Sequence, residues 1–265
     1  MTKVVTHVYL PSEPLQFRMR LAPGLLGDCV DMTNAKMALA ELEPEGLTPA
    51  DESWQERKRS EFRVTVLEAV ITCLAEDGYA NTTTERVAAR ARVSRGTMLH
   101  RFPSRQALIE AAIEYAFFKR MQNFIADLNT LSEEERVLQN LGVMRSWEQY
   151  FSTAYRAYLE LHIAAKTDEG LRKVFLPRAK LYDRIWRREV FRVFPEWSKD
   201  KETLDRCSEF VRAALEGLAL NSDIWDDPDQ LQVIVQLVSD TAIALRDKTL
   251  KLRKPAKVKP AKARS

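Results

Sequence analysis

The sequence predicts an all-α protein with a small helical head on its N-terminal side and a larger helical body behind it. Apolar residues recur at three- and four-residue intervals, as at Phe62, Val66, Ala69 and Cys73, which is the period of an amphipathic helix. Helix-capping residues precede several of these segments, and no segment has the alternation of a strand. A composition of 45% hydrophobic and 30% charged residues, with only eight glycines, fits a globular helical protein.

The same composition excludes several classes of protein. No run approaches the roughly 18 apolar residues of a membrane-spanning helix, and the first residues lack the apolar core of a signal peptide. Cys29, Cys73 and Cys207 lie far apart, which predicts neither a disulfide framework nor a metal site. His7 and His162 also lack metal-ligand partners at a useful spacing. We therefore expect a cytoplasmic protein without cofactor, metal or membrane contact.

Charge is distributed unevenly along the chain. Residues Arg86–Ile109 hold six arginines and no acidic residue, and Arg246–Ser265 holds nine basic residues and one aspartate. These segments carry +6 and +8, so the remainder carries −11 within a net charge of +3. Two basic segments on an acidic body indicate a polyanionic partner.

Four regions are predicted along the chain. Residues 1–52 are rich in proline, with a short helix possible at Met32–Leu42; they form either an N-terminal arm, ordered or disordered, or a stretch upstream of the natural start. The helical head takes residues 53–118 and the helical body residues 119–250. The Lys/Pro/Ala-rich tail, residues 251–265, is expected to be disordered.

The helices of the head follow from their caps. The first begins near Trp54 and ends at Asp77-Gly78, where glycine suits a helix end. Thr82 with Glu85 fits a capping box, with Thr83 as a rival cap. Ser94 is the predicted N-cap of a short helix over Arg95–Arg101. Ser104 then starts a longer helix that runs to about Leu128.

The body is predicted to consist of helices as well. Ser132 and Glu135 form a second capping box, and Pro177 is expected to break the helical stretch that contains it. The expected segments are a helix near Ser146–Lys166, one or two helices within Asp168–Phe194, a helix over Asp200–Asn221 and a last one over Asp227–Arg253.

Two short helices joined at Ala91-Arg92-Val93 make a helix-turn-helix candidate. In such a unit the second helix enters the major groove of DNA, and arginines without carboxylates suit the phosphate backbone. The stretch GYANTTTERVAARARVSRGTMLHRFPSRQALIEA resembles the TetR family of bacterial transcriptional regulators. The resemblance covers about residues 56–118. It has two departures: Arg92 stands where the family has the turn glycine, and Leu99 stands where it has a tyrosine.

The resemblance implies a DNA-binding role for particular residues. Thr83 and Thr84 would contact phosphate, Arg95, Gly96 and Thr97 would face bases, and His100 and Arg101 would lie at the groove edge. Arg105 would hold the DNA backbone. No catalytic motif is present, so we expect no enzyme.

The resemblance also implies that the body forms a homodimer and encloses a pocket for an unknown small-molecule effector. The dimer would use the last two long helices, through Phe210, Val211, Ala214, Leu215, Leu218, Trp225, Leu231, Ile234, Val235, Leu237, Val238 and Ile243. The pocket candidates are Trp147, Phe151, Tyr155, Tyr158 and His162, which would share one face of a single helix; a plain core stripe is the alternative. Tyr182 and Trp186 are candidates to line the same cavity.

Two functions remain open on these grounds. One is an effector-responsive repressor that binds a palindromic double-stranded DNA operator as a homodimer. The other is a TetR-like scaffold that organises DNA or recruits a partner without an effector. The basic tail could add non-specific, salt-dependent DNA affinity or serve only as a solubilising end.

Overall fold

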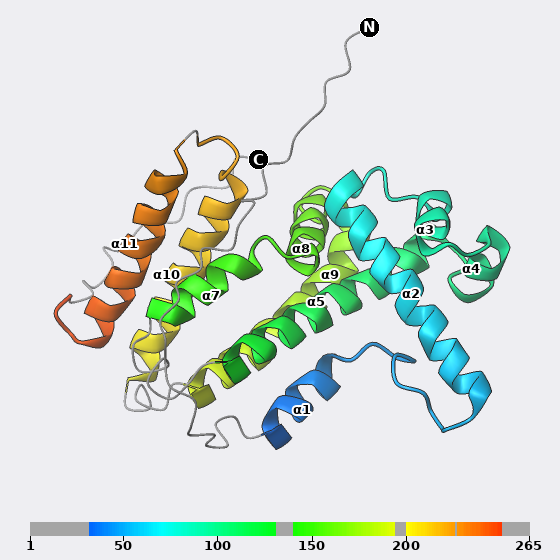
Figure 1. Cartoon of the computed structure of the whole chain (residues 1–265), viewed down its shortest axis with the longest axis horizontal. Coiled ribbons are helices and arrows are strands. Elements are labelled where there is room, and N and C mark those ends of the chain that lie inside the picture. The colour runs from blue at the N-terminus through cyan, green and yellow to red at the C-terminus, as the bar shows by residue number, and fades with distance from the viewer. Residues whose placement is uncertain (1–31, 131–139, 194–199, 226, 251–265) are drawn as a thin grey trace, which may run out of the picture.

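The computed structural model describes residues 32–130, 140–193, 200–225 and 227–250, and every regular element within them is a helix (Figure 1). The all-α prediction is therefore confirmed for this part of the chain. The helices are α1 (Met32–Leu42), α2 (Trp54–Asp77), α3 (Thr84–Ala91), α4 (Arg95–Arg101), α5 (Arg105–Thr130), α7 (Asn140–Gln149), α8 (Thr153–Ala164), α9 (Glu169–Val193), α10 (Lys201–Leu220) and α11 (Pro228–Arg246). Residues 1–31, the Ser132–Glu135 capping box and the tail 251–265 lie outside the described residues.

Helices α2, α3 and α4 form the head at one end of the molecule, and α10 and α11 lie at the other end (Figure 1). A seven-residue helix such as α4 is unstable alone, so burial of neighbouring side chains must hold it. Met98 is fully buried and Phe102 is 2% exposed. These two side chains anchor α4 to the head and leave its opposite face in solvent.

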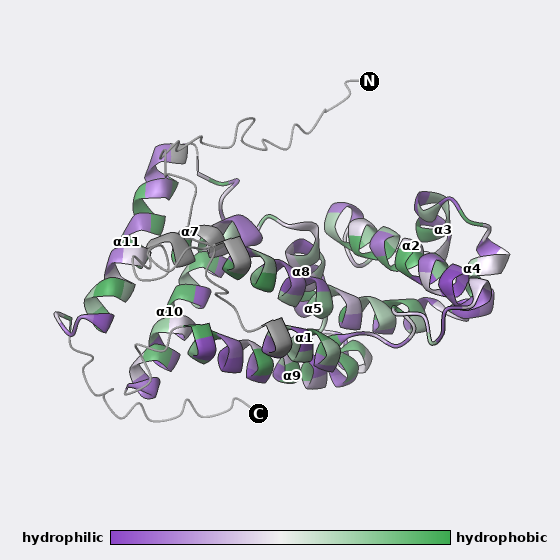
Figure 2. Ribbon diagram, turned by 60° about the horizontal axis from the view of Figure 1, so that its bottom comes forward, coloured by the Kyte–Doolittle hydropathy of each residue, from purple (hydrophilic) through white to green (hydrophobic). Residues whose placement is uncertain are grey.

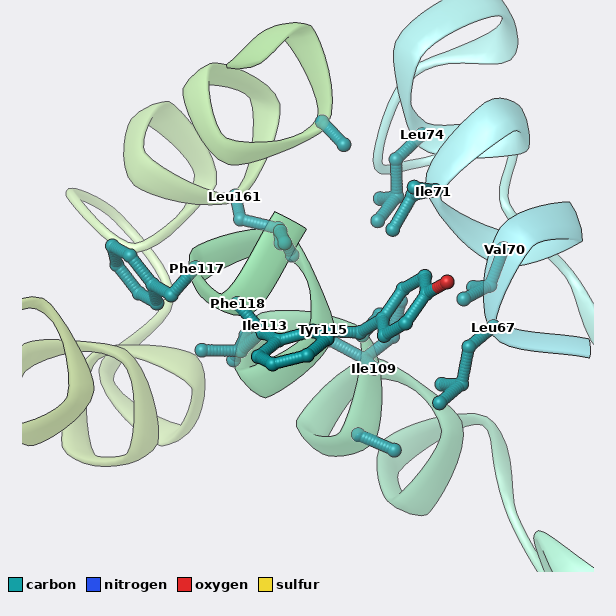
Figure 3. Packing of buried hydrophobic residues seen from close by; sticks show 14 of the residues in the cluster. Leu67, Val70, Ile71, Leu74, Ile109, Ile113, Tyr115, Phe117, Phe118 and Leu161 are labelled. Carbon is teal, nitrogen blue, oxygen red and sulfur yellow. The ribbon is translucent and has the colours of Figure 1, made fainter. Parts of the chain in front are cut away.

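The long helix α5 joins the head to the body without a linker. It starts in the head at Arg105 and continues past residue 118 to Thr130. Its apolar side chains, among them Ile109 and Ile113, pack between α2 and α8 (Figure 3). Tyr115 points from α5 toward α2, where its hydroxyl donates to the Glu68 carboxylate at 2.6 Å (Figure 3). One core cluster therefore joins the head to α8 and α9 of the body, whereas the buried residues of α10 and α11 belong to two further clusters.

Helix α1 belongs to this core. The predicted helix at Met32–Leu42 is confirmed, and it packs along α5 and α9. Ala38 is fully buried and Ala35 is 3% exposed. Residues 32–42 are thus part of the fold, although the prediction from the sequence assigned residues 1–52 to an N-terminal extension.

The prediction of a single helix near Ser146–Lys166 is wrong. Helix α7 ends at Gln149 and α8 begins at Thr153. Between them, Tyr150 and Phe151 donate to carbonyls only three residues back, those of Trp147 and Glu148. The Ser152 hydroxyl then accepts the N–H of Tyr155 at 3.2 Å and caps the new helix.

Two other helix boundaries differ from the expectation. Pro177 does not break its helix, since α9 runs through it from Glu169 to Val193. Proline costs about 3 kcal/mol inside a helix, and burial on both sides of it offsets this, with Phe175 1% and Ile185 2% exposed. Helix α11 ends at Arg246 rather than Arg253, just before the left-handed Lys248.

Candidate nucleic-acid interface and body cavity

The turn between α3 and α4 depends on Arg92. Its φ of 56° and ψ of 39° place it in the left-handed region, which costs a residue other than glycine about 1–2 kcal/mol. The turn recovers two backbone hydrogen bonds: Arg92 N–H donates to Ala89 at 3.2 Å, and Val93 N–H donates to Ala88 at 3.0 Å. The chain thus makes the tight turn of a helix-turn-helix without the usual glycine.

The start of α4 presents three small or polar positions to solvent. Ser94 caps the helix, as predicted, by accepting the Thr97 N–H at 3.0 Å, and its Oγ lies 2.7 Å from Thr97 Oγ1. Arg95, Gly96 and Thr97 are exposed. A Cβ on Gly96 would meet only Ser94 Oγ, at 3.9 Å. The fold itself therefore does not require glycine at position 96. A glycine at an exposed position without such a requirement is expected where a binding partner comes close to the backbone.

The six arginines of the basic segment are in part neutralised by the elements beside them. Arg86 and Arg90 pair with carboxylates at the end of α2, and Arg95 pairs with Glu85 at 2.8 Å. The Arg101 guanidinium lies 5.4 Å from the centre of the Phe62 ring. Arg92 forms no ion pair within the part of the chain that the structure describes. Since exposed ion pairs contribute little stability, DNA phosphates could replace Glu85 beside Arg95 at small cost.

The Arg105 side chain is engaged in contacts within the protein and does not extend freely into solvent. Its Nε donates to the Thr82 carbonyl at 2.8 Å and its Nη2 to the Tyr79 carbonyl at 2.5 Å. Its guanidinium also stacks 4.5 Å from the Tyr79 ring centre. These contacts hold the loop that precedes α3, so they direct the side chain away from the DNA backbone role that the resemblance implied.

The two threonines predicted to contact phosphate differ in position. Thr83 is the N-cap of α3 and accepts the Arg86 N–H at 3.3 Å, so the capping box with Thr82 is wrong. Thr82 is instead fully buried and donates to the Gly78 carbonyl. Thr84 is 8% exposed, and its hydroxyl bonds to Glu85. Only Thr83 keeps its side chain partly open at the surface.

The sequence prediction missed a basic group at the start of α2. Lys58, Arg59 and Trp54 line a surface hollow together with Thr97 and Arg101 of α4, and Trp54 is 66% exposed. The signal was present in the ERKR run at residues 56–59, outside the helix-turn-helix. This hollow adds the start of α2 to the basic surface of α4. Hydrophilic residues are frequent in the ribbon at this end of the head (Figure 2).

The body contains a cavity of about 190 Å³ between α5, α7, α8, α9 and α10, closed on one side by α11. Of the five predicted pocket residues, only Tyr155 lines it. Trp147 belongs to α7, a different helix from α8, and Phe151 is 42% exposed. Tyr158 and His162 stack on Phe175 in the core. The five residues were expected to share one face because the prediction assumed a single unbroken helix. Tyr182 and Trp186, the other two candidates from the sequence, do line the cavity.

Polar contacts tie the head to α8 and to the start of α9. The Tyr79 N–H donates to Glu160 at 3.0 Å and its hydroxyl to Asp168 at 3.2 Å. Arg156 donates to the Ala75 carbonyl at 2.8 Å. Gly78 has a φ of 82°, and a Cβ there would lie 3.4 Å from Glu160. Helix α8 thus contacts the head along the same stretch that reaches the cavity at Tyr155.

A three-helix head with a capped, exposed second motif helix defines a helix-turn-helix protein. Residues 66–112 match the model of the bacterial regulatory proteins of the tetR family. The chain is 29% identical over 119 residues to the HTH-type transcriptional regulator CymR of Pseudomonas putida, and the match covers 45% of this chain and 58% of that relative. Over this N-terminal segment the chain is therefore similar to TetR-family regulators, and it spans less than two thirds of the relative's own length.

Two solved structures align with most of this chain at TM-scores below 0.5. GusR of Salmonella enterica has a TM-score of 0.48 at 19% identity, covering 71% of this chain and 96% of GusR. The multidrug binding protein EbrR, solved with imidazole, has a TM-score of 0.47 at 22% identity, covering 74% of this chain and 97% of EbrR. Among the described residues, no helix has the length and apolarity to cross a membrane.

Proposed function

We propose that this protein is a transcriptional repressor that binds a two-fold symmetric operator as a homodimer and releases it when a small molecule occupies the body cavity. The observation that carries the proposal is the exposed start of α4, where Arg95, Gly96 and Thr97 stand on a helix fixed by Met98 and Phe102. Arginine can bond guanine through two donors in the major groove, and glycine permits close approach.

The proposed dimer surface is an apolar stripe on α10 and α11. Phe210 and Leu220 of α10 are 41% and 51% exposed, and Val233 and Leu237 of α11 are 66% and 62% exposed. Gly217 lies between these two α10 residues, and a Cβ added to it would meet no atom within 4 Å. Leu215, Val235 and Val238, also predicted for the dimer, are buried within the protomer. Exposed apolar patches of this kind mark association sites.

Helix α8 is the proposed link between effector and DNA. Tyr155 reaches the cavity, and Arg156 and Glu160 bond to the end of α2 and the loop after it. A ligand that prefers one position of α8 would therefore bias the position of the head. It could shift DNA affinity only by its own preference between the two states.

The alternative, an effector-independent DNA scaffold, would need no cavity in the body. The cavity of about 190 Å³, with Tyr155, Tyr182 and Trp186 in its wall, favours the effector-responsive function. We propose no catalytic activity.

The test is selection of a binding site by the purified full chain from a pool of random duplexes at low salt. We expect an inverted repeat whose half-sites lie about 34–36 Å apart, which is one DNA turn. A protein that enriches no sequence, or binds every duplex equally, would contradict operator recognition.

A further inference from the structure

We propose that the body cavity binds a small organic carboxylate, with the Arg120 guanidinium as its counter-ion. The inference rests on the proposed function, because it names the chemical class of the effector. Arg120 lies on α5 in the wall of the cavity. It is the one arginine in that wall that lacks a carboxylate partner among the described residues.

Aromatic rings surround the Arg120 guanidinium. Its central carbon lies 3.9 Å from the ring centre of Tyr158, 4.6 Å from that of Tyr182 and 5.0 Å from that of Tyr155. Such contacts stabilise a cation by about 0.5–2 kcal/mol each. They leave its charge and its N–H donors without an anion.

The phenols cannot supply that negative charge. Burial raises the pKa of Tyr150, Tyr155 and Tyr158 above the ordinary value of a tyrosine. They are therefore neutral near pH 7. A permanently charged arginine in this setting has a desolvation cost of several kcal/mol. The aromatic contacts offset part of this cost, but no carboxylate of the described residues pairs with the guanidinium.

The nearby acidic groups do not pair with Arg120. Asp127 of α5 accepts a hydrogen bond from Gln149. Glu216 of α10 acts on the cavity tyrosines, but no carboxylate of the described residues forms an ion pair with Arg120. The other arginine of the wall, Arg212, already pairs with Asp183 at 2.9 Å and with Glu209 at 2.7 Å. Among the described residues, the cavity wall therefore presents one cation without a carboxylate partner, which suits a monoanion.

A second unsatisfied group faces the same space. The Tyr155 side chain is 5% exposed and lines the cavity. Its hydroxyl is buried without a hydrogen-bond partner in the described part of the chain. A buried hydroxyl without a partner costs about 1–3 kcal/mol. One carboxylate accepts bonds from a guanidinium and a phenol together, so a single ligand group would satisfy both.

The remaining wall sets the size and character of the ligand. A cavity of about 150 Å³ holds benzene, and this one measures about 190 Å³. Much of the wall is apolar: Phe124, Leu128, Val143, Trp186, Val190 and Leu204. The fitting ligand is a carboxylate on an apolar body about the size of one ring.

Calorimetric titration of the full chain, without DNA, compares benzoate with its neutral isosteres benzamide and benzyl alcohol. We expect benzoate to bind at least about 10-fold more tightly than either, the factor for one lost charged hydrogen bond. Arg120→Met should abolish this preference. Tyr155→Phe should weaken it, and Arg172→Met, at an exposed position of α9 outside the cavity, should leave it intact.

The proposal is overturned if wild-type protein binds none of the three compounds, binds them equally, or keeps its preference for benzoate in Arg120→Met. Should Arg120→Met fail to fold, as judged by circular dichroism, the wild-type preference and Tyr155→Phe still decide. Binding of the selected duplex is measured on the same preparations. Absence of a benzoate preference with intact duplex binding refutes only the carboxylate assignment, whereas absence of duplex binding refutes the proposed function.

Discussion

Arg105 and Arg95 show that neighbouring arginines of one basic segment can have different tasks. Arg105 is turned inward to two loop carbonyls and the Tyr79 ring. Arg95 extends from α4 with a side chain 59% exposed. Sequence places both in the same cluster, and only their surroundings separate a stabilising residue from a candidate for base recognition.

Arg105→Met should therefore destabilise the protein, whereas Arg95→Met should not. We expect the first to lower the free energy of unfolding by about 2–4 kcal/mol, because two charged hydrogen bonds and a stacking contact disappear. The second should change it by less than about 0.5 kcal/mol. Urea denaturation followed by circular dichroism measures both, and equal effects would refute the division of roles.

The strained turn at Arg92 offers a second comparison at this scale. Arg92→Gly should raise the free energy of unfolding by up to about 1 kcal/mol, because glycine adopts φ of 56° without strain. Arg90→Gly, inside α3, should lower it, since it removes ion pairs to Glu76 and Asp77 as well as helix propensity. Thermal melts of both variants test this, and a destabilised Arg92→Gly would show that the turn is not strained.

Among the helices, α10 and α11 carry the proposed dimer contact. Gly217→Arg should convert the protein to a monomer with unchanged helicity, because the protomer has open space at this site and a partner helix would not. Lys180→Glu, on the exposed side of α9, is the control and should stay dimeric. Analytical ultracentrifugation at several concentrations gives the result. A wild-type monomer, or a dimeric Gly217→Arg, would place the interface elsewhere.

Most of the helices could be predicted from local signals, and the failures had local causes. Ser94 and Ser104 fixed the starts of α4 and α5 because their hydroxyls cap the next turn. The cap at Ser152 was overlooked because the aromatic spacing continues across it. Pro177 was predicted to break its helix. Local sequence does not show that the helix on both sides of this proline packs into the core of the protein, which offsets the cost. Tyr155, Tyr182 and Trp186 of the cavity wall were predicted from the sequence, whereas Arg120 was not, since the wall is built from helices that lie far apart in the sequence.

In the whole molecule, the proposed DNA-binding and dimer surfaces lie at opposite ends, on α4 and on α10 and α11 (Figure 1). The body cavity is lined by residues of α5, α7, α8, α9, α10 and α11. Helices α5 and α8 connect the cavity with the head: α5 carries Arg120 and Arg105, and α8 carries Tyr155 and Glu160. A ligand that draws these helices together would act on the head directly. In the proposed dimer, this arrangement would allow a ligand in each cavity to change the spacing of the two heads.

The most direct test of the account is the ratio of specific to non-specific DNA affinity in the double variant Arg95→Ala with Thr97→Ala. We predict that fluorescence anisotropy will show at least about 10-fold weaker binding to the selected operator, with affinity for a random duplex of equal length reduced far less. Equal losses on both duplexes, or an unchanged operator affinity, would mean that α4 does not read the bases.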